Sequence, residues 1–180
     1  MNFTKLLSKL LNRIGLIGKW VHLYRIKKAK KILKKLHEIN KTPNSYGRII
    51  SYLRKINPYV FEELVLTAIE NSNIYIIRNK RYSGDGGIDG MFKLKQGKVL
   101  VQSKRYIGYI NNQHVSELSK LVKNNKYYFG IFVHTGKTGD KSKNIMRLEK
   151  NILFISGSVL VELLLGKINI AEHIETKARR

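Results

Sequence analysis

Cysteine is absent from this 180-residue chain, which excludes disulfide bonds, thiolate metal sites and a cysteine nucleophile. No run approaches the roughly 20 apolar residues that a membrane-spanning helix needs. We expect no secretory signal, because Lys5, Lys9 and Arg13 interrupt the apolar N-terminal residues. We therefore expect a soluble, cytoplasmic protein with one domain and an appendage.

Acidic residues are scarce. Only 12 Asp and Glu accompany 35 Lys and Arg, which leaves a net charge of +23. Such a surface repels itself and needs a polyanion to neutralise it, so DNA, RNA and an anionic membrane are the candidate partners. The excess is uneven: residues 1–57 contain 15 basic side chains and one acid, whereas residues 58–180 contain 20 and 11. We infer two regions with different roles.

Residues 1–57 have the pattern of basic amphipathic helices. Apolar residues recur at alternating steps of three and four, which predicts one apolar helical stripe. Gly15 and Gly18 weaken this helix, and a break into two helices is expected there. Trp20 is expected to lie in a protein core. The stripe consists of Phe3, Leu7, Leu10, Ile14, Ile17, Val21 and Tyr24.

Lysines cover the helix that continues after Arg25. In an ordinary protein such a run is a solvated face, but the near absence of acids favours a face that binds phosphates. No base-reading motif accompanies it, so contacts to the DNA backbone are expected. Binding to a membrane surface and packing against the protein's own core or a second copy, as in a homodimer, are the alternatives. The lysines concerned are Lys27, Lys28, Lys31, Lys34 and Lys35.

The remaining chain alternates between helical and strand patterns, which predicts an α/β fold with a mixed central sheet flanked by helices. We expect this domain to span residues 58–166, after the basic helical segment 1–57 and before a C-terminal tail, 167–180. Helices are predicted at residues 46–56, 60–70, 112–125, 141–150 and 158–165, and strands at 74–78, 88–94, 99–104, 127–133 and 152–155.

Three polar residues on two predicted neighbouring strands form the candidate site. Gln102 and Lys104 are two residues apart and therefore point to the same face. If the strands pair through a turn at residues 95–98, Asp89 comes opposite them. Oxygen ligands suit Mg²⁺, and a nearby lysine can orient a water or stabilise charge on a phosphate. The spacing is compatible with metal-assisted phosphodiester hydrolysis, but it also occurs by chance in many sheets.

At these residues the sequence resembles the catalytic domain of Mrr-like restriction endonucleases, of the PD-(D/E)xK nuclease superfamily. The resemblance covers roughly residues 58–166 and implies a restriction-endonuclease-like fold and a metal-dependent DNA endonuclease. It rests on Phe61-Glu62-Glu63-Leu64-Val65, on Ser83-Gly84-Asp85-Gly86-Gly87-Ile88-Asp89-Gly90 and on Val101-Gln102-Ser103-Lys104-Arg105-Tyr106. It continues weakly through residues 130–136 and 151–157.

The resemblance implies a role for each site residue. Asp89 would be the main metal-binding acid, Gln102 would stand where most of the superfamily has Glu or Asp, and Lys104 would be the catalytic lysine. Glu62 would be the helical acid that helps to bind Mg²⁺, or Mn²⁺ in its place. Glu63 is the competing choice; we expect it to face solvent or a basic side chain.

Other residues near these motifs have weaker assignments. Asp85 is expected to hold the glycine-rich turn rather than to bind metal. Arg105 and Lys137 are candidate phosphate contacts, each with a structural alternative. His114 and His134 lack partners at metal-ligand spacing, so we expect ordinary polar roles for both.

Two further functions remain open from the sequence. One is a non-catalytic nucleic-acid-binding or interaction module on a nuclease fold, and the other is a junction-resolving nuclease. The expected partner is DNA in each nuclease interpretation.

Overall fold

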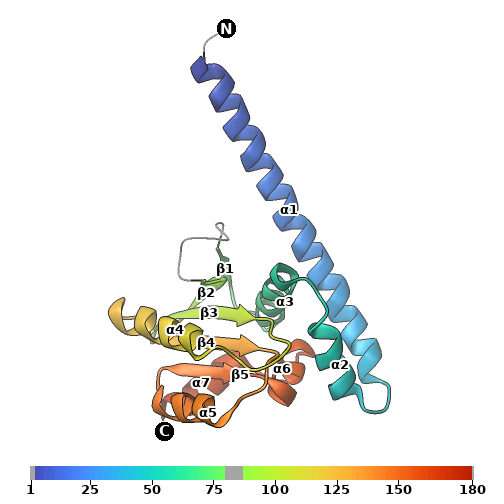
Figure 1. Cartoon of the computed structure of the whole chain (residues 1–180), viewed down its shortest axis with the longest axis vertical. Coiled ribbons are helices and arrows are strands. Elements are labelled where there is room, and N and C mark those ends of the chain that lie inside the picture. The colour runs from blue at the N-terminus through green and yellow to red at the C-terminus, as the bar shows by residue number, and fades with distance from the viewer. Residues whose placement is uncertain (1–2, 80–86, 180) are drawn as a thin grey trace.

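The computed structural model describes residues 3–79 and 87–179, with side chains from residue 18 onward. A long N-terminal helix leaves a body made of a sheet and shorter helices (Figure 1). The elements are α1 (Phe3–Asn40), α2 (Ser45–Leu53), α3 (Pro58–Glu70), β1 (Ile77–Arg78), β2 (Gly90–Leu94), β3 (Gly97–Lys104), α4 (Asn112–Asn124), β4 (Phe129–His134), α5 (Asp140–Leu148), β5 (Ile152–Ile155), α6 (Gly157–Leu164) and α7 (Ile170–Ala178).

The five strands form one mixed sheet in the order β1-β2-β3-β4-β5. β1, β2 and β3 pair antiparallel, and β4 and β5 extend the sheet in parallel with β3. Only Lys95 and Gln96 separate β2 from β3, which is the short turn that the sequence predicts. The predicted mixed sheet with flanking helices is confirmed.

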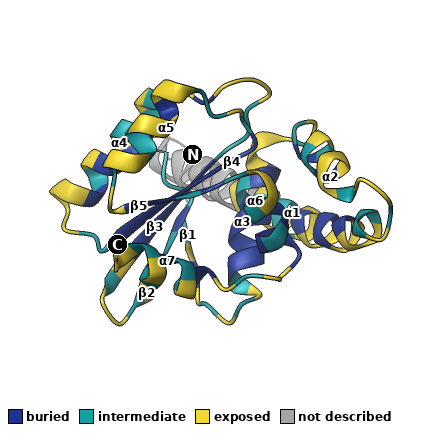
Figure 2. Cartoon of the chain, turned by 90° about the horizontal axis from the view of Figure 1, so that it is seen from below, coloured by how far each residue is buried: buried dark blue, intermediate teal, exposed yellow. Residues whose placement is uncertain are grey.

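Helices cover both faces of the sheet, so its strands are largely buried (Figure 2). On one face Val99 and Val101 of β3 join a large core that also contains residues of α1, α3, α6 and α7. On the other face Leu100, between those two valines, joins a smaller core with α4. This alternation is what a period-2 strand requires when both of its faces are covered.

The helix α1 runs unbroken through Gly15 and Gly18, so the expected break is wrong. A glycine costs a helix about 1 kcal/mol relative to alanine, which is too little to end it where the flanking residues favour a helix. The part of α1 after Arg25 packs into the large core through Ala29, Ile32, Leu33 and Leu36. The N-terminal part of α1 projects away from the body (Figure 1).

Trp20 lies on this projecting part and is 72% exposed, so the expected core position is also wrong. The apolar stripe predicted burial, but its members Val21 and Tyr24 are exposed as well, so the body does not cover this part of the stripe. None of the described helices combines the length and the apolar character that crossing a membrane requires.

A buried ion-pair cluster fastens α1 and β1 to α3. Glu63 of α3 is only 3% exposed. One of its oxygens lies 3.1 Å from His22 Nδ1 of α1, and the other accepts a hydrogen bond of 3.1 Å from Arg78 Nε of β1. Arg78 also donates to both carboxylate oxygens of Glu70, at 2.8 and 2.7 Å. Burial raises the pKa of Glu63, and the two basic partners oppose that rise.

Secondary-structure boundaries differ modestly from the predicted ones. The strand predicted at residues 74–78 is limited to β1, and β2 begins one residue after Asp89. The predicted tail contains α7, whose Ile170 and Ile174 are buried in the large core. Two buried positions a single turn apart are too few to reveal a helix by periodicity.

The ion-pair cluster yields a stability prediction. Arg78→Met leaves the buried Glu63 carboxylate with one partner fewer, and we expect it to lower the free energy of unfolding by about 3 kcal/mol. Lys41→Met is the control because Lys41 pairs with Glu38 where both side chains are 70% exposed. That change should stay within about 0.5 kcal/mol. Urea denaturation compares the two, and equal losses would contradict the role given to the cluster.

Candidate active site at the end of β3

The start of α3 is built by a capped first turn, which fixes where Glu62 lies. The Asn57 side chain accepts hydrogen bonds from the backbone N–H groups of Tyr59 and Val60, at 3.0 and 3.4 Å. Pro58 at the first helical position needs no N–H partner and has a φ that suits a helix. Glu62 follows one turn later, half-buried beside the sheet.

Two adjacent strands position the other predicted site residues. Gln102 and Lys104 lie on β3, and Asp89 immediately precedes β2. Asp89 N–H donates to the Val101 carbonyl at 2.9 Å, so the β2–β3 ladder continues through Asp89. The register that pairs Gly90 with Val101 places Asp89 opposite Gln102. The Asp89 carboxylate accepts a hydrogen bond of 2.6 Å from the Ser103 backbone N–H.

Gly87 packs directly over Gln102 and Lys104. Gln102 Nε2 donates to the Gly87 carbonyl at 3.0 Å. A Cβ at Gly87 would come within 2.7 Å of that nitrogen and 3.3 Å of Lys104 Nζ, and its φ of +74° favours glycine. A glycine is therefore required here. Asp85, in the same glycine-rich segment, lies outside the described residues.

Electrostatics link the two carboxylates of the site. Burial raises the pKa of Asp89 well above its usual range, and the neighbouring Glu62 charge raises it further, while Lys104 opposes the rise. Burial likewise raises the pKa of Glu62 to about 7, against the lowering effects of Lys104 and Arg25. Both carboxylates are thus close to one lysine, in a position where negative charge is poorly solvated.

This donor set fits a divalent cation. Two half-buried carboxylates that repel each other gain from a shared positive ion, and hard oxygen ligands suit Mg²⁺. Because Gln102 Nε2 donates a hydrogen bond to the Gly87 carbonyl, Gln102 Oε1 is the atom suited to face a cation. Within residues 3–79 and 87–179, no group of three or more His, Cys, Asp and Glu side chains gathers at metal-binding distance. Among the described residues, Asp89 and Glu62 therefore supply the two carboxylates of this site.

Glu62 and Glu63 have different surroundings in the structure. The expectation for Glu63 is that it faces either solvent or a basic side chain. It contacts two basic side chains and is buried. Glu62 is the α3 acid whose pKa responds to Lys104, and Asp89 responds to Glu62. Nearly every position of α3 from Val60 to Ile69 is buried, so helical periodicity alone could not distinguish the two.

Sequence reasoning missed Arg25 as a neighbour of the site. Its guanidinium carbon lies 4.4 Å from the centre of the Tyr59 ring, on α3 one turn before Glu62. Its charge lowers the pKa of both Glu62 and Glu63. No sequence signal marks this residue, because it belongs to a different helix and looks like one more cation in a basic run.

The candidate phosphate contacts lie in three places. All five lysines named on α1 are exposed. Lys137 is exposed in the loop after β4, whereas Arg105 is half-buried and its guanidinium donates to the Arg54 carbonyl. That contact gives Arg105 a structural partner.

The two histidines have separate surroundings. The ring of His114 is hydrogen-bonded through Nδ1 to the Tyr106 hydroxyl. His134 pairs with Lys104 in the β3–β4 register and is fully buried. Burial lowers the pKa of His134 to about 4, so it is neutral at physiological pH.

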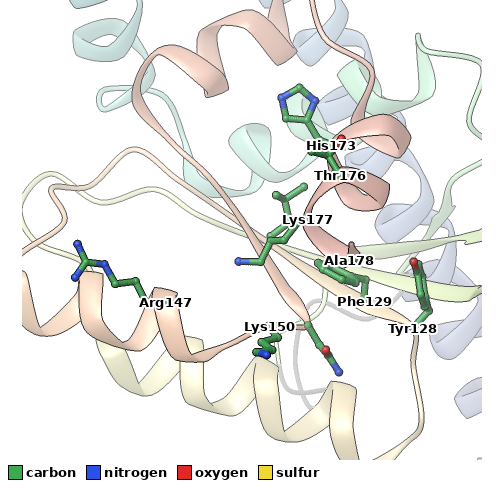
Figure 3. Close-up of a pocket in the computed structure, with 10 residues that line it drawn as sticks. Tyr128, Phe129, Arg147, Lys150, His173, Thr176, Lys177 and Ala178 are labelled. Atoms are coloured by element: carbon green, nitrogen blue, oxygen red, sulfur yellow. The ribbon is translucent and has the colours of Figure 1, made fainter. Parts of the chain in front are cut away.

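A cavity of about 770 Å³ lies at the other end of the parallel strands (Figure 3). It is lined by the start of β4, the residues before β5, and the last turns of α5 and α7. Arg147, Lys150 and Lys177 contribute basic side chains there. Because Lys104 ends β3 and Phe129 begins β4, this cavity is separate from the candidate active site.

The raised pKa of Glu62 predicts a pH dependence of stability without metal. Its unfolded value is near 4.5 and its folded value is about 7, so its contribution is fully present below 4.5 and is lost as pH rises towards 7. In EDTA, the free energy of unfolding of Glu62→Gln should rise relative to that of the original protein by on the order of 1–2 kcal/mol across that pH range. A fully buried carboxylate would give a larger difference, but water reaches Glu62. Glu38→Gln, on the exposed surface of α1, should give no such divergence. Urea denaturation at several pH values measures it, and parallel curves for Glu62→Gln would contradict the assignment.

Comparison with known proteins shows the family to which the chain belongs. The Mrr catalytic-domain family, described as restriction endonuclease, matches residues 53–164, more than half of the chain. No protein in the curated set matches. Among solved structures the chain is similar to "MspJI Restriction Endonuclease in Complex with 27-mer Oligonucleotide", with a TM-score of 0.51 and 18% identity. The similarity covers 77% of this chain and 37% of that one, and at this identity it shows a shared fold. On the family match over residues 53–164, the chain belongs to the restriction endonuclease family.

Proposed function

We propose that the protein is a metal-dependent DNA endonuclease of the Mrr-like type, with Asp89, Gln102, Lys104 and Glu62 as its catalytic set. The observation that carries the proposal is the meeting of a carboxylate, an amide oxygen and a lysine at the ends of two paired strands, beside a second carboxylate from α3. All four residues lie within residues 53–164, the part of the chain that matches the restriction endonuclease family. The catalytic domain would span residues 58–166.

Asp89 and Glu62 would hold Mg²⁺, or Mn²⁺ in its place, together with Gln102 Oε1. A divalent cation in that position supplies positive charge that stabilises the developing negative charge on the phosphodiester. Lys104 Nζ, held beside Gly87, would orient the attacking water or stabilise charge on a phosphate oxygen. The Ser103 N–H fixes the orientation of the Asp89 carboxylate.

DNA is the proposed partner, and α1 would add affinity to it. The five exposed lysines of α1 lie outside the family match, on a segment with one acid among 16 charged side chains. Contacts from such a face go to phosphates, so they raise affinity for all sequences alike and weaken with salt.

The catalytic set yields a direct prediction. Lys104→Ala and Asp89→Ala should each lower the rate of plasmid nicking by about 10²- to 10⁴-fold, because each removes a group used on the reacting phosphate. DNA binding should change little. Lys93→Ala, an exposed lysine of β2 outside the site, is the control and should cleave normally.

The measurement uses supercoiled plasmid, methylated or not, with Mg²⁺ or EDTA. Metal-dependent nicking or linearisation by the original protein supports an enzyme. DNA binding without any cleavage would favour the non-catalytic nucleic-acid-binding module instead.

Gln102 yields a second prediction, on metal affinity. Gln102→Glu adds a negative charge to the proposed ligand set, so the free protein should bind Mn²⁺ at least several-fold more tightly. Gln96→Glu, in the exposed β2–β3 turn, adds the same charge elsewhere and should leave Mn²⁺ affinity unchanged. Titration calorimetry compares both variants, and unchanged affinity in Gln102→Glu would remove Gln102 from the metal ligands.

A further inference from the structure

Aromatic and basic side chains share one exposed face of α1. Trp20, Tyr24, Lys28, Lys31 and Lys35 recur every three or four residues, so they lie along the same side of the helix. We call them the aromatic–lysine row. Trp20 and Tyr24 are 72% and 62% exposed, and all three lysines are exposed. Two large aromatic side chains in water on a helix that leaves the body indicate a binding surface.

The cations of this region lie against aromatic rings. Lys28 Nζ is 5.8 Å from the centre of the Tyr24 ring, and Lys35 Nζ is 4.6 Å from that of Tyr52 on α2. Among the described residues, no carboxylate forms an ion pair with Lys28, Lys31 or Lys35. The row therefore combines positive charge that lacks an acidic partner with exposed aromatic faces.

That combination fits an unpaired nucleic-acid strand better than a duplex. Lysines contact phosphates in either case, but a duplex keeps its bases stacked inside, where Trp20 and Tyr24 cannot reach them. An unpaired strand offers bases that stack on aromatic rings, with cations alongside the backbone. The exposed aromatic residues are thus explained by single-stranded DNA and not by phosphate binding alone.

Two other occupants fit less well. A helix that lies on a membrane separates its apolar face from its basic face, whereas lysines and aromatic residues here share one face. A second copy of α1 would bring together two helices of charge +10, each with 11 Lys and Arg and with Glu38 as its single acid. Like charge at that density opposes pairing.

Arg25, within the span of the row but not part of it, brings α1 beside the candidate active site. Arg25, the residue after Tyr24, lies over the ring of Tyr59, which is 41% exposed. Tyr59 is one turn before Glu62 on α3. The row therefore lies on the helix that borders the candidate active site.

We propose that the aromatic–lysine row binds an unpaired DNA strand next to the cleavage site, so that the preferred substrate carries a single-stranded segment. This inference rests on the proposed endonuclease function and names its substrate class. It assigns base stacking to Trp20 and Tyr24 and phosphate binding to the three lysines.

Trp20 provides the test, because it is the only tryptophan in the chain. The full-length protein is titrated in EDTA with a thymidine oligonucleotide and, separately, with a blunt duplex of equal length. The oligonucleotide should quench Trp20 emission, because stacked bases quench indole, and the duplex should not. Tyr24→Ala should weaken oligonucleotide binding by about 5- to 150-fold and leave duplex binding nearly unchanged.

Two variants complete the design. Tyr24→Phe keeps the ring face and should bind the oligonucleotide normally. Tyr75→Ala removes a tyrosine that is 80% exposed but lies outside the row, so it should leave both affinities unchanged. Because both tyrosines are exposed, a thermal melt should show the same stability for every variant.

Other outcomes would overturn the inference in distinguishable ways. Equal binding of both DNAs without quenching would reduce the row to a phosphate contact and leave the proposed nuclease function standing. A blue shift of Trp20 on phosphatidylserine–phosphatidylcholine vesicles, lost in Tyr24→Ala, would assign the row to a membrane. A blue shift that grows with protein concentration alone would assign it to a second copy. Failure to bind either DNA would contradict the proposed function as well.

Discussion

The buried carboxylate of Glu63 is the constraint on which the arrangement of this molecule depends. A carboxylate without water must find basic partners, and here they come from two elements distant in sequence, His22 on α1 and Arg78 on β1. Satisfying it holds the long helix against α3 and fixes the rotation of α3 about its own axis. Since Glu62 is the residue immediately before Glu63, the same contacts bear on where its side chain points. A structural acid thus helps to position the acid that we propose as a metal ligand.

The sequence was a good guide to the strands and a poor guide to the helices' surroundings. Gln102 and Lys104 could be placed on one face because the period of a strand is two, and the short turn at Lys95 and Gln96 brought Asp89 opposite them. The choice between Glu62 and Glu63 could not be derived, because α1 covers the side of α3 that periodicity treats as exposed. Trp20 was misjudged for the opposite reason, since an apolar stripe does not reveal whether a partner surface exists.

Charge balance gives the candidate site its character. Two carboxylates, Asp89 and Glu62, lie near two cations, Lys104 and Arg25, and one cation comes from outside the region that matches the family. With the neutral Gln102 in the set, the number of carboxylates stays at two. Such a site would hold a divalent cation less strongly than one with three carboxylates, and oxygen atoms of a bound phosphate could complete the ligand set.

The order of the strands also bears on how the chain folds. They lie in the sheet in the order in which they occur along the chain, from β1 to β5. Each new strand therefore joins an open edge, and none has to be inserted between two strands that are already paired. The hairpin of β2 and β3 can form first from neighbouring residues, and β4 and β5 then add through one helix each. Contacts between residues close in sequence favour rapid folding, so the sheet can grow outward from one hairpin as successive segments become available.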